Sequence, residues 1–251
     1  MYKVAKLKVT SKITDERNKV IHLDYLLSML YKNGQILNNW IIEEHIDYLE
    51  VRVTTTDDDS LNSKYFNNYI LKELENFTLD ITILSDDASA TDCCNCDEHS
   101  YYILAVNPND SSSPIICGDC GKEIPLIRIP YLYNEEEHYS ILNFQQIYSS
   151  VDNLWMNSLS DRFTKRQITN HDSQLNKLGL DIVNELEKKV NKPVYLFIAN
   201  PIGGYFEFEK NNKNLEYCPK CGGESLNILI MIMLIKFVKN VDWRSLHMKN
   251  N

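Results

Sequence analysis

The first part of the chain contains one segment in which apolar residues recur with the period of a helix. Apolar residues recur at helical spacing from Val20 to Leu30, after a cap at Thr14 or Asp15 and before the Asn33-Gly34 pair. Ser, Thr and Asp are preferred first caps of helices, and Gly is preferred just beyond the last turn. The pattern predicts an amphipathic helix between these signals.

Strand patterns flank this helix. Residues 2–9 are predicted to form a strand with a bulge between Val4 and Leu7, where the alternation slips. Residues 40–46 and 48–54 predict two further strands, and the second alternates cleanly between apolar and charged positions. Residues 77–83 predict a fourth.

A second helix is expected between the last two strands. Asp57 to Ser60 would provide a turn and a cap, and Phe66, Ile70 and Leu74 follow at steps of four. The resulting order, strand-helix-strand-strand-helix-strand, predicts a ferredoxin-like domain over residues 1–86, with two helices on one face of an antiparallel sheet.

The patterns after residue 86 predict several smaller structural units, so that the whole protein belongs to the α+β class. We expect a zinc ribbon over residues 87–131, including a short strand at 124–130, and a mixed α/β region over residues 132–213. Within that region, 139–148 fits a strand or a helix, 172–190 predicts a helix, and 194–199 predicts a buried strand.

The seven cysteines fall into three close groups. The first two groups contain Cys93, Cys94 and Cys96, and then Cys117 and Cys120, at about the separation of a hairpin. Four thiolates on two tight turns can surround a zinc ion tetrahedrally, with bonds of about 2.3 Å. The spacing therefore predicts one structural zinc ion.

The spacing of the cysteines leaves two questions about this site open. Cys96, Cys117 and Cys120 are expected ligands, and either Cys94 or Cys93 completes the set. The rival interpretation is a redox dithiol at Cys117 and Cys120. Such dithiols normally precede a helix that lowers a thiol pKa, whereas the prolines after Gly121 do not favour a helix there.

The third group, Cys218-Pro-Lys-Cys221, has no second pair. We interpret residues 214–251 as a truncated or frameshifted second ribbon whose metal site is lost. Back-translation of the tail with AT-rich codons, read two bases later, restores a C-x-x-C with codons across Phe237/Val238 and Asn240/Val241. A genuine buried strand at 228–235 is the alternative.

Several motifs resemble a bacterial family described as zinc-ribbon-containing candidate nucleic-acid-binding proteins of unknown function. The matching segments are Tyr31–Leu37, Cys94-x-Cys96 with Ser100–Leu104, Cys117–Cys120 with Ile124–Pro130, Asp161–Lys165, Gln174–Gly179 and Cys218–Gly223. The resemblance favours Cys94 over Cys93 as a ligand. It also implies a second C-x-x-C followed by Arg-Leu, which this chain lacks.

Composition and charge narrow the functional classes. The chain has 251 residues, with 26 Lys+Arg against 35 Asp+Glu and a net charge of −9, so any binding of polyanions must be local. Phosphate-binding and hydrolase motifs are missing, and four thiolates leave no open metal position, so we expect a non-enzymatic protein. The candidate nucleic-acid contacts are Arg128, Arg162, Lys165 and Arg166.

The alternative function is a protein-interaction module, such as a regulator or a toxin-neutralising partner. It would use an acidic surface, with candidate faces at residues 57–59 and 135–137. The N-terminus lacks the apolar core of a secretory signal, and the longest apolar run, 228–235, is too short to span a membrane. We therefore expect a cytoplasmic protein without membrane contact.

Overall fold

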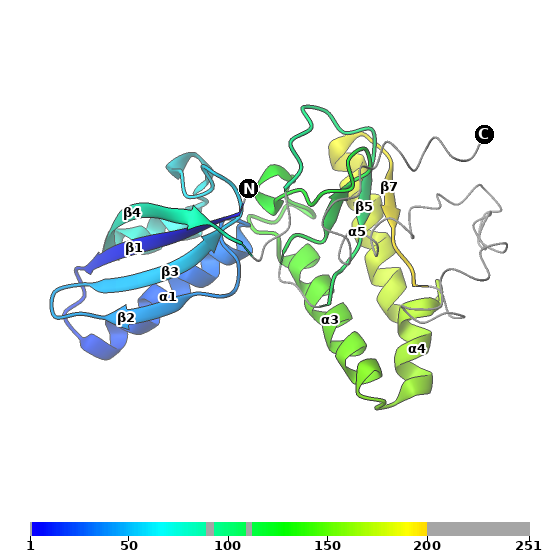
Figure 1. The fold of residues 1–251 in the computed structure, drawn as a ribbon, viewed down its shortest axis with the longest axis horizontal. Helices are drawn as coiled ribbons and strands as arrows, with labels where there is room; N and C mark the ends of the chain where they lie inside the picture. Colours follow the sequence, from blue (N-terminus) through cyan, green and yellow to red (C-terminus); the bar gives the residue numbers. More distant parts are fainter. Residues whose placement is uncertain (1, 89–92, 109–111, 200–251) are drawn as a thin grey trace.

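The computed structural model describes residues 2–88, 93–108 and 112–199. It is a mixed α+β protein in which an N-terminal and a C-terminal unit lie side by side (Figure 1). Each unit has its own small β-sheet, its own helices and its own apolar core.

The N-terminal unit contains the predicted order of elements. These are β1 (Lys3–Ser11), α1 (Glu16–Lys32), β2 (Ile41–Glu44), β3 (Leu49–Thr55), α2 (Asn68–Glu73) and β4 (Phe77–Asp86), with short 3-10 turns at Ser63–Tyr65 and Leu74–Asn76. The sheet order is β2-β3-β1-β4, and every neighbouring pair is antiparallel. The predicted bulge in the first strand is confirmed as a register shift between Val4 and Ala5.

Alternation along the central strands places the core of this unit between sheet and helices. Leu7 and Val51 are nearly fully buried and pair across β1 and β3, and Leu27 of α1 packs in the same cluster. The opposite sheet face carries charged side chains, with Lys6 and Glu50 paired at 3.6 Å. No aromatic side chain of β1 or β3 is available there for base stacking, because neither described strand contains one.

One expectation in this unit was wrong. Asp57 to Ser60 do not cap the second helix, because α2 begins at Asn68 and the Asn67 side chain accepts the Ile70 N–H at 3.0 Å. The acidic run instead forms turns, in which Asp57 pairs with Arg128 of the C-terminal unit while Asp58 and Asp59 pair with lysines of the N-terminal unit. Local capping signals occur twice in this segment, and tertiary contacts determine which one starts the helix.

The C-terminal unit places a three-stranded sheet against helices. Its elements are β5 (Tyr102–Leu104), β6 (Ile115–Cys117), α3 (Tyr139–Met156), α4 (Asp161–Thr169), α5 (Gln174–Val190) and β7 (Val194–Leu196). The sheet order is β6-β5-β7, with β5 antiparallel to β6 and parallel to β7. The segment 139–148, for which the sequence allowed a strand or a helix, is part of the helix α3. The helix predicted over 172–190 is confirmed as α5, with a cap at Ser173.

The short strand predicted at residues 124–130 is wrong. The chain makes a 3-10 turn at Leu126–Arg128 instead. Pro125 precedes this turn and has no N–H to donate to a ladder, which limits strand formation. Ile124 retains one sheet-like bond, its N–H donating to the Ile115 carbonyl at 2.8 Å.

The two units meet closely at this turn. Gly34, just beyond α1, has a φ of +78°, and a Cβ there would lie 2.8 Å from Leu126 Cβ and 2.9 Å from Ile127 N. The His138 N–H donates to the Lys32 carbonyl at 2.8 Å, which joins the end of α1 to the start of α3. The glycine therefore serves both the left-handed end of α1 and the contact between units.

Candidate metal centre

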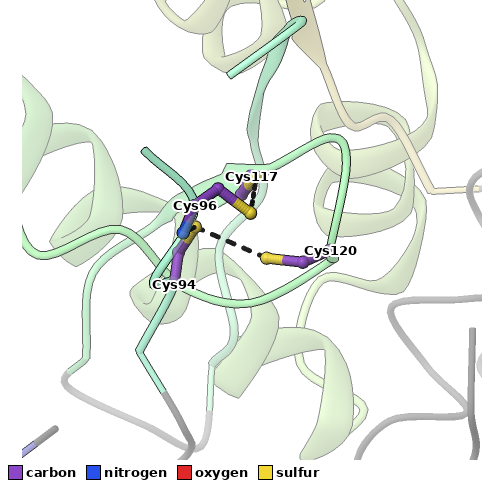
Figure 2. A group of neighbouring side chains, drawn as sticks. All are labelled: Cys94, Cys96, Cys117 and Cys120. Atoms are coloured by element: carbon purple, nitrogen blue, oxygen red, sulfur yellow. Dashed lines mark hydrogen bonds between the residues drawn. The ribbon is translucent and has the colours of Figure 1, made fainter. Parts of the chain in front are cut away.

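The sulfur atoms of Cys94, Cys96, Cys117 and Cys120 converge at one point of the C-terminal unit (Figure 2). All four lie within 4.8 Å of one another. Cys94 Sγ is 3.4 Å from Cys120 Sγ, and Cys96 Sγ is 4.0 Å from Cys117 Sγ. Four bonds of about 2.3 Å to a central ion require sulfurs about 3.8 Å apart. The group could therefore hold a metal ion.

A tight turn after β6 positions the second cysteine pair. Cys117 ends β6, and the Gly121 N–H donates back to the Cys117 carbonyl at 2.8 Å. Gly121 has a φ of +69°, a left-handed conformation that glycine adopts without strain. The Gly118 N–H donates to the Tyr101 carbonyl at 3.0 Å, which fixes the turn against the start of β5.

The first cysteine pair lies on an extended segment beside the second. The Cys94 N–H donates to the Glu123 carbonyl at 2.7 Å, and the Cys96 N–H approaches Cys94 Sγ at 3.3 Å. An N–H directed at a sulfur stabilises a thiolate there, because it places positive charge next to the anion. The C-x-C spacing thus brings both sulfurs to the same side of the loop.

Cys93 lies outside this group. Its thiol is directed at the Thr56 carbonyl, with a sulfur-to-oxygen distance of 3.6 Å, and it packs with Tyr2 and Leu37. The side chain is only 2% exposed. Of the two candidates that spacing left open, the structure places Cys94 with the other three sulfurs.

The surroundings of the cluster disfavour isolated thiolates. Burial raises the pKa of Cys94 to about 11, and a hydrogen bond with Cys120, followed by burial, raises the pKa of Cys117. A redox dithiol needs the opposite, a lowered pKa and usually a helix terminus. The segment after Cys120 contains only the 3-10 turn Leu126–Arg128, so the geometry does not favour the dithiol interpretation. A cation would supply the missing stabilisation.

Two further side chains, His99 and Asp119, lie beside the sulfurs. His99 Nε2 is 3.5 Å from Cys94 Sγ, and His99 Nδ1 is 3.4 Å from the Tyr102 hydroxyl. Asp119 Oδ2 accepts the Ser100 N–H at 2.6 Å and is 3.9 Å from Cys117 Sγ. The structure thus places His99 next to a proposed ligand. Its position three residues after Cys96 was the available signal.

Arg128 has a structural role in the described protein. Its Nε donates to Asp57 Oδ2 at 2.5 Å, and one terminal nitrogen donates to the Cys94 carbonyl at 2.7 Å. Burial alone would raise the pKa of Asp57, but this guanidinium holds the pKa of the carboxyl below its usual value. The side chain predicted to contact phosphate thus connects the cysteine cluster to the N-terminal unit.

The other predicted basic contacts lie together on α4 (Figure 1). Arg162, Lys165 and Arg166 are exposed, and none forms an ion pair within the described part of the chain. By contrast, Lys3 and Lys6 of β1 are matched by the carboxylates of Asp86 and Glu50. The helix therefore presents local positive charge on an acidic protein.

The two acidic runs are engaged within the protein. In the first run, Asp58 pairs with Lys3 at 3.6 Å, and Asp59 pairs with Lys64. In the second run, Ser140 donates to Glu135 and Lys32 lies 3.9 Å from Glu137. Their charges are partly matched, which reduces their attraction for a basic partner.

Cys218, Cys221 and the tail interpreted as a frameshift product lie outside the described residues. Among the helices that the structure describes, none has the length and hydrophobicity needed to cross a bilayer.

Comparisons with known proteins place both units among domains without an assigned role. Residues 1–88 match a domain of unknown function, DUF8589, and residues 96–199 match another, DUF2310. An uncharacterized protein of Haemophilus influenzae is 26% identical over an alignment covering 76% of each chain. A second uncharacterized protein from that organism is 26% identical over 56% of this chain and 67% of its own. No solved structure matches. These matches support a bacterial family of unknown function.

Proposed function

We propose that this chain, whose two matched domains have no established activity, is a non-enzymatic protein built around a structural zinc ion. The supporting observation is the convergence of four sulfur atoms within 4.8 Å of one another. Zinc is the metal that such a tetrahedral set of thiolates most often binds in structural sites. In this proposal the N-terminal unit is a ferredoxin-like domain and the cysteine turns form a zinc ribbon.

The chemistry of the donor set argues for scaffolding and against catalysis. Catalytic zinc sites keep one position open for water or substrate, whereas four cysteines would fill every position of a tetrahedral ion. The sulfurs border the core of the C-terminal unit, with Cys94 and Cys117 fully buried among its apolar side chains. Metal binding at such a point stabilises the fold. A reducing compartment such as the cytosol would keep the thiols available.

Elemental analysis of the purified full-length chain tests this proposal. A Cys218→Ser/Cys221→Ser background limits the measurement to the described group, and we expect about one zinc ion per chain. Adding Cys117→Ser should abolish the bound zinc and expose the middle segment to proteolysis, because metal binding and folding are coupled.

Cys93→Ser is the matched control, since Cys93 is a buried free thiol next to a proposed ligand. This variant should keep the zinc content of its parent. Equal zinc content in the Cys93 and Cys117 variants would contradict the proposed ligand set.

A second candidate function, nucleic-acid binding, is favoured by one observation. The three basic side chains of α4 are exposed and lack ion pairs among the described residues, and Phe163 beside them is 54% exposed. Basic groups that track a backbone, together with an exposed aromatic ring, are the usual elements of single-strand binding. On the sheet of the N-terminal unit, by contrast, Lys6 and Arg52 are matched by Glu50 and Glu43.

Fluorescence anisotropy with a random single-stranded oligonucleotide, measured at several salt concentrations, tests this second function. Replacing Arg162, Lys165 and Arg166 by Ala should weaken binding and lower the slope of log K against log salt by about 0.7 per lost contact. The control is Arg52→Ala, at an arginine already matched by Glu43 and Glu50. If the protein does not bind the oligonucleotide even at low salt, nucleic-acid binding is contradicted and the protein-interaction function becomes the better alternative.

A further inference from the structure

The β4 strand presents a long free edge. It occupies one end of the N-terminal sheet, spans ten residues, and has no strand partner on its outer side among the described residues (Figure 1). The other edge, β2, has four residues, two of them Glu43 and Glu44. Protein edges are normally kept short or charged, because unpaired backbone groups invite another strand.

The ladder with β1 shows which backbone groups face outward. The Lys12 N–H donates to the Asn76 carbonyl at 2.9 Å, one position beyond the Ser11–Phe77 pair. Backbone groups in an antiparallel ladder alternate between the two sides of a strand. The N–H and C=O groups of Leu79, Ile81 and Ile83 therefore point away from β1.

The same residues carry apolar side chains that the helices leave uncovered. Ile81 pairs with buried Leu7, which places its side chain on the helix side of the sheet. Ile81 is nevertheless 43% exposed and Ile83 48% exposed, because α2 spans only six residues. Between residues 77 and 84 the strand contains one charged residue, Asp80, and no Pro or Lys.

We propose that β4 pairs with β4 of a second copy of this chain, antiparallel and with the two-fold axis at Ile81. This register uses the outward-facing groups and sets Leu79 opposite the partner's Ile83. Asp80 then lies opposite the partner's Thr82, so no like charges oppose each other. The two sheets become one continuous antiparallel sheet.

The sequence of the strand fits a second copy because it complements itself. Within residues 79–83, a two-fold axis at Ile81 sets apolar positions opposite apolar positions and polar positions opposite polar ones, as an isologous interface requires. The exposed apolar side chains become neighbours across the new junction, and the free backbone groups gain partners. This dimer is independent of the zinc and nucleic-acid proposals.

Sedimentation equilibrium of the full-length chain over a range of concentrations tests the pairing, and we expect a monomer–dimer equilibrium. Ile81→Lys and Ile81→Glu should each be monomeric, because each sets like charges against each other at the axis. An equimolar mixture of the two variants should regain the dimer, since residue 81 then faces the opposite charge.

Ile46→Lys is the matched control. Ile46 is fully exposed in the turn at the other edge of the same sheet, so this variant should dimerise like the wild type. Circular dichroism verifies that every variant is folded. A wild type that is monomeric at all concentrations would overturn the proposal, as would folded Ile81 variants that dimerise alone or fail to dimerise when mixed.

Discussion

At the residue scale, two adjacent cysteines have different environments because their backbone is extended. Successive side chains of an extended segment point to opposite sides. Cys93 forms a backbone bridge to Glu123 and directs its thiol at the N-terminal unit, whereas Cys94 directs its thiol at the cluster. One step along the chain thus separates a packing residue from a proposed metal ligand.

His138 is a residue whose burial has a measurable consequence. It is 2% exposed at the start of α3, its Nδ1 has no hydrogen-bond partner among the described residues, and its ring lies 4.8 Å from that of Tyr131. Burial lowers the pKa of His138 to about 3. The folded protein therefore keeps this ring neutral at pH values where an exposed histidine becomes charged.

We predict that His138 makes the protein less stable as pH falls. The unfolded chain takes up a proton below about pH 6.5, and the folded chain does so only near pH 3, so folding stability declines between these values. The slope is about 1.4 kcal/mol per pH unit, or about 2 kcal/mol from pH 6.5 to pH 5. Denaturant unfolding at a series of pH values measures it.

His138→Phe keeps an aromatic ring and removes the titrating group. The difference in unfolding free energy between this variant and the wild type should change by about 2 kcal/mol over the same range, in favour of the variant at low pH. A difference that stays constant with pH would show that His138 titrates alike in the folded and unfolded states.

At the element scale, long periodic segments were predictable and short ones were not. The helices α1 and α5 have apolar stripes and side-chain caps, at Asp15 and Ser173, and both follow the predicted pattern closely. The nine-residue α4 was not predicted, and the Ser160 side chain before it makes no capping bond. Ser160 instead adopts a left-handed conformation, which sequence pattern alone does not indicate.

The short strands depend on partners that are distant in sequence. Val194–Leu196 pairs in parallel with Tyr102–Leu104, across most of the C-terminal unit. Segments of three residues carry too little periodicity to determine their neighbours. The pairing of β7 follows from how α3 and α5 pack against the sheet. Only the presence of a strand was predictable, and the prediction of a buried strand over 194–199 was wrong in part, because β7 ends at Leu196 and Tyr195 is 43% exposed.

At the scale of the whole molecule, buried polar contacts join the two units next to the cysteine cluster. Arg128 connects Asp57 of the N-terminal unit to the Cys94 carbonyl. The Tyr2 hydroxyl donates to the Glu123 carboxylate at 3.2 Å, and Glu123 also accepts the Ser112 hydroxyl at 2.7 Å. The loop that carries the proposed ligands is thus also the loop that holds the units together.

We predict that Arg128→Ala destabilises the full-length protein by about 2 kcal/mol, because it leaves the largely buried Asp57 carboxylate without its charged donor. Denaturant unfolding at neutral pH measures this loss. Arg52→Ala, which removes an exposed pair, should change stability by about 0.5 kcal/mol or less.

A double-mutant cycle with Asp57→Ala isolates the contact between the two side chains. The combined variant should be less destabilised than the sum of the single variants, because the two groups share one interaction. Strict additivity would show that Arg128 acts through its bond to the Cys94 carbonyl alone.

The sequence by itself determined the order of elements in the N-terminal unit, the bulge in β1, the helices α1 and α5, and the cysteines from which a metal group could form. These features depend on hydrogen bonds, caps and burial within a few turns of chain, which local patterns report. Only the tertiary structure showed that Cys93 packs against the N-terminal unit while Cys94 joins the other sulfurs, that Arg128 connects the two units, and that one edge of β4 has no partner strand among the described residues. Those outcomes depend on contacts between residues far apart in the chain, where neither periodicity nor spacing specifies the partner.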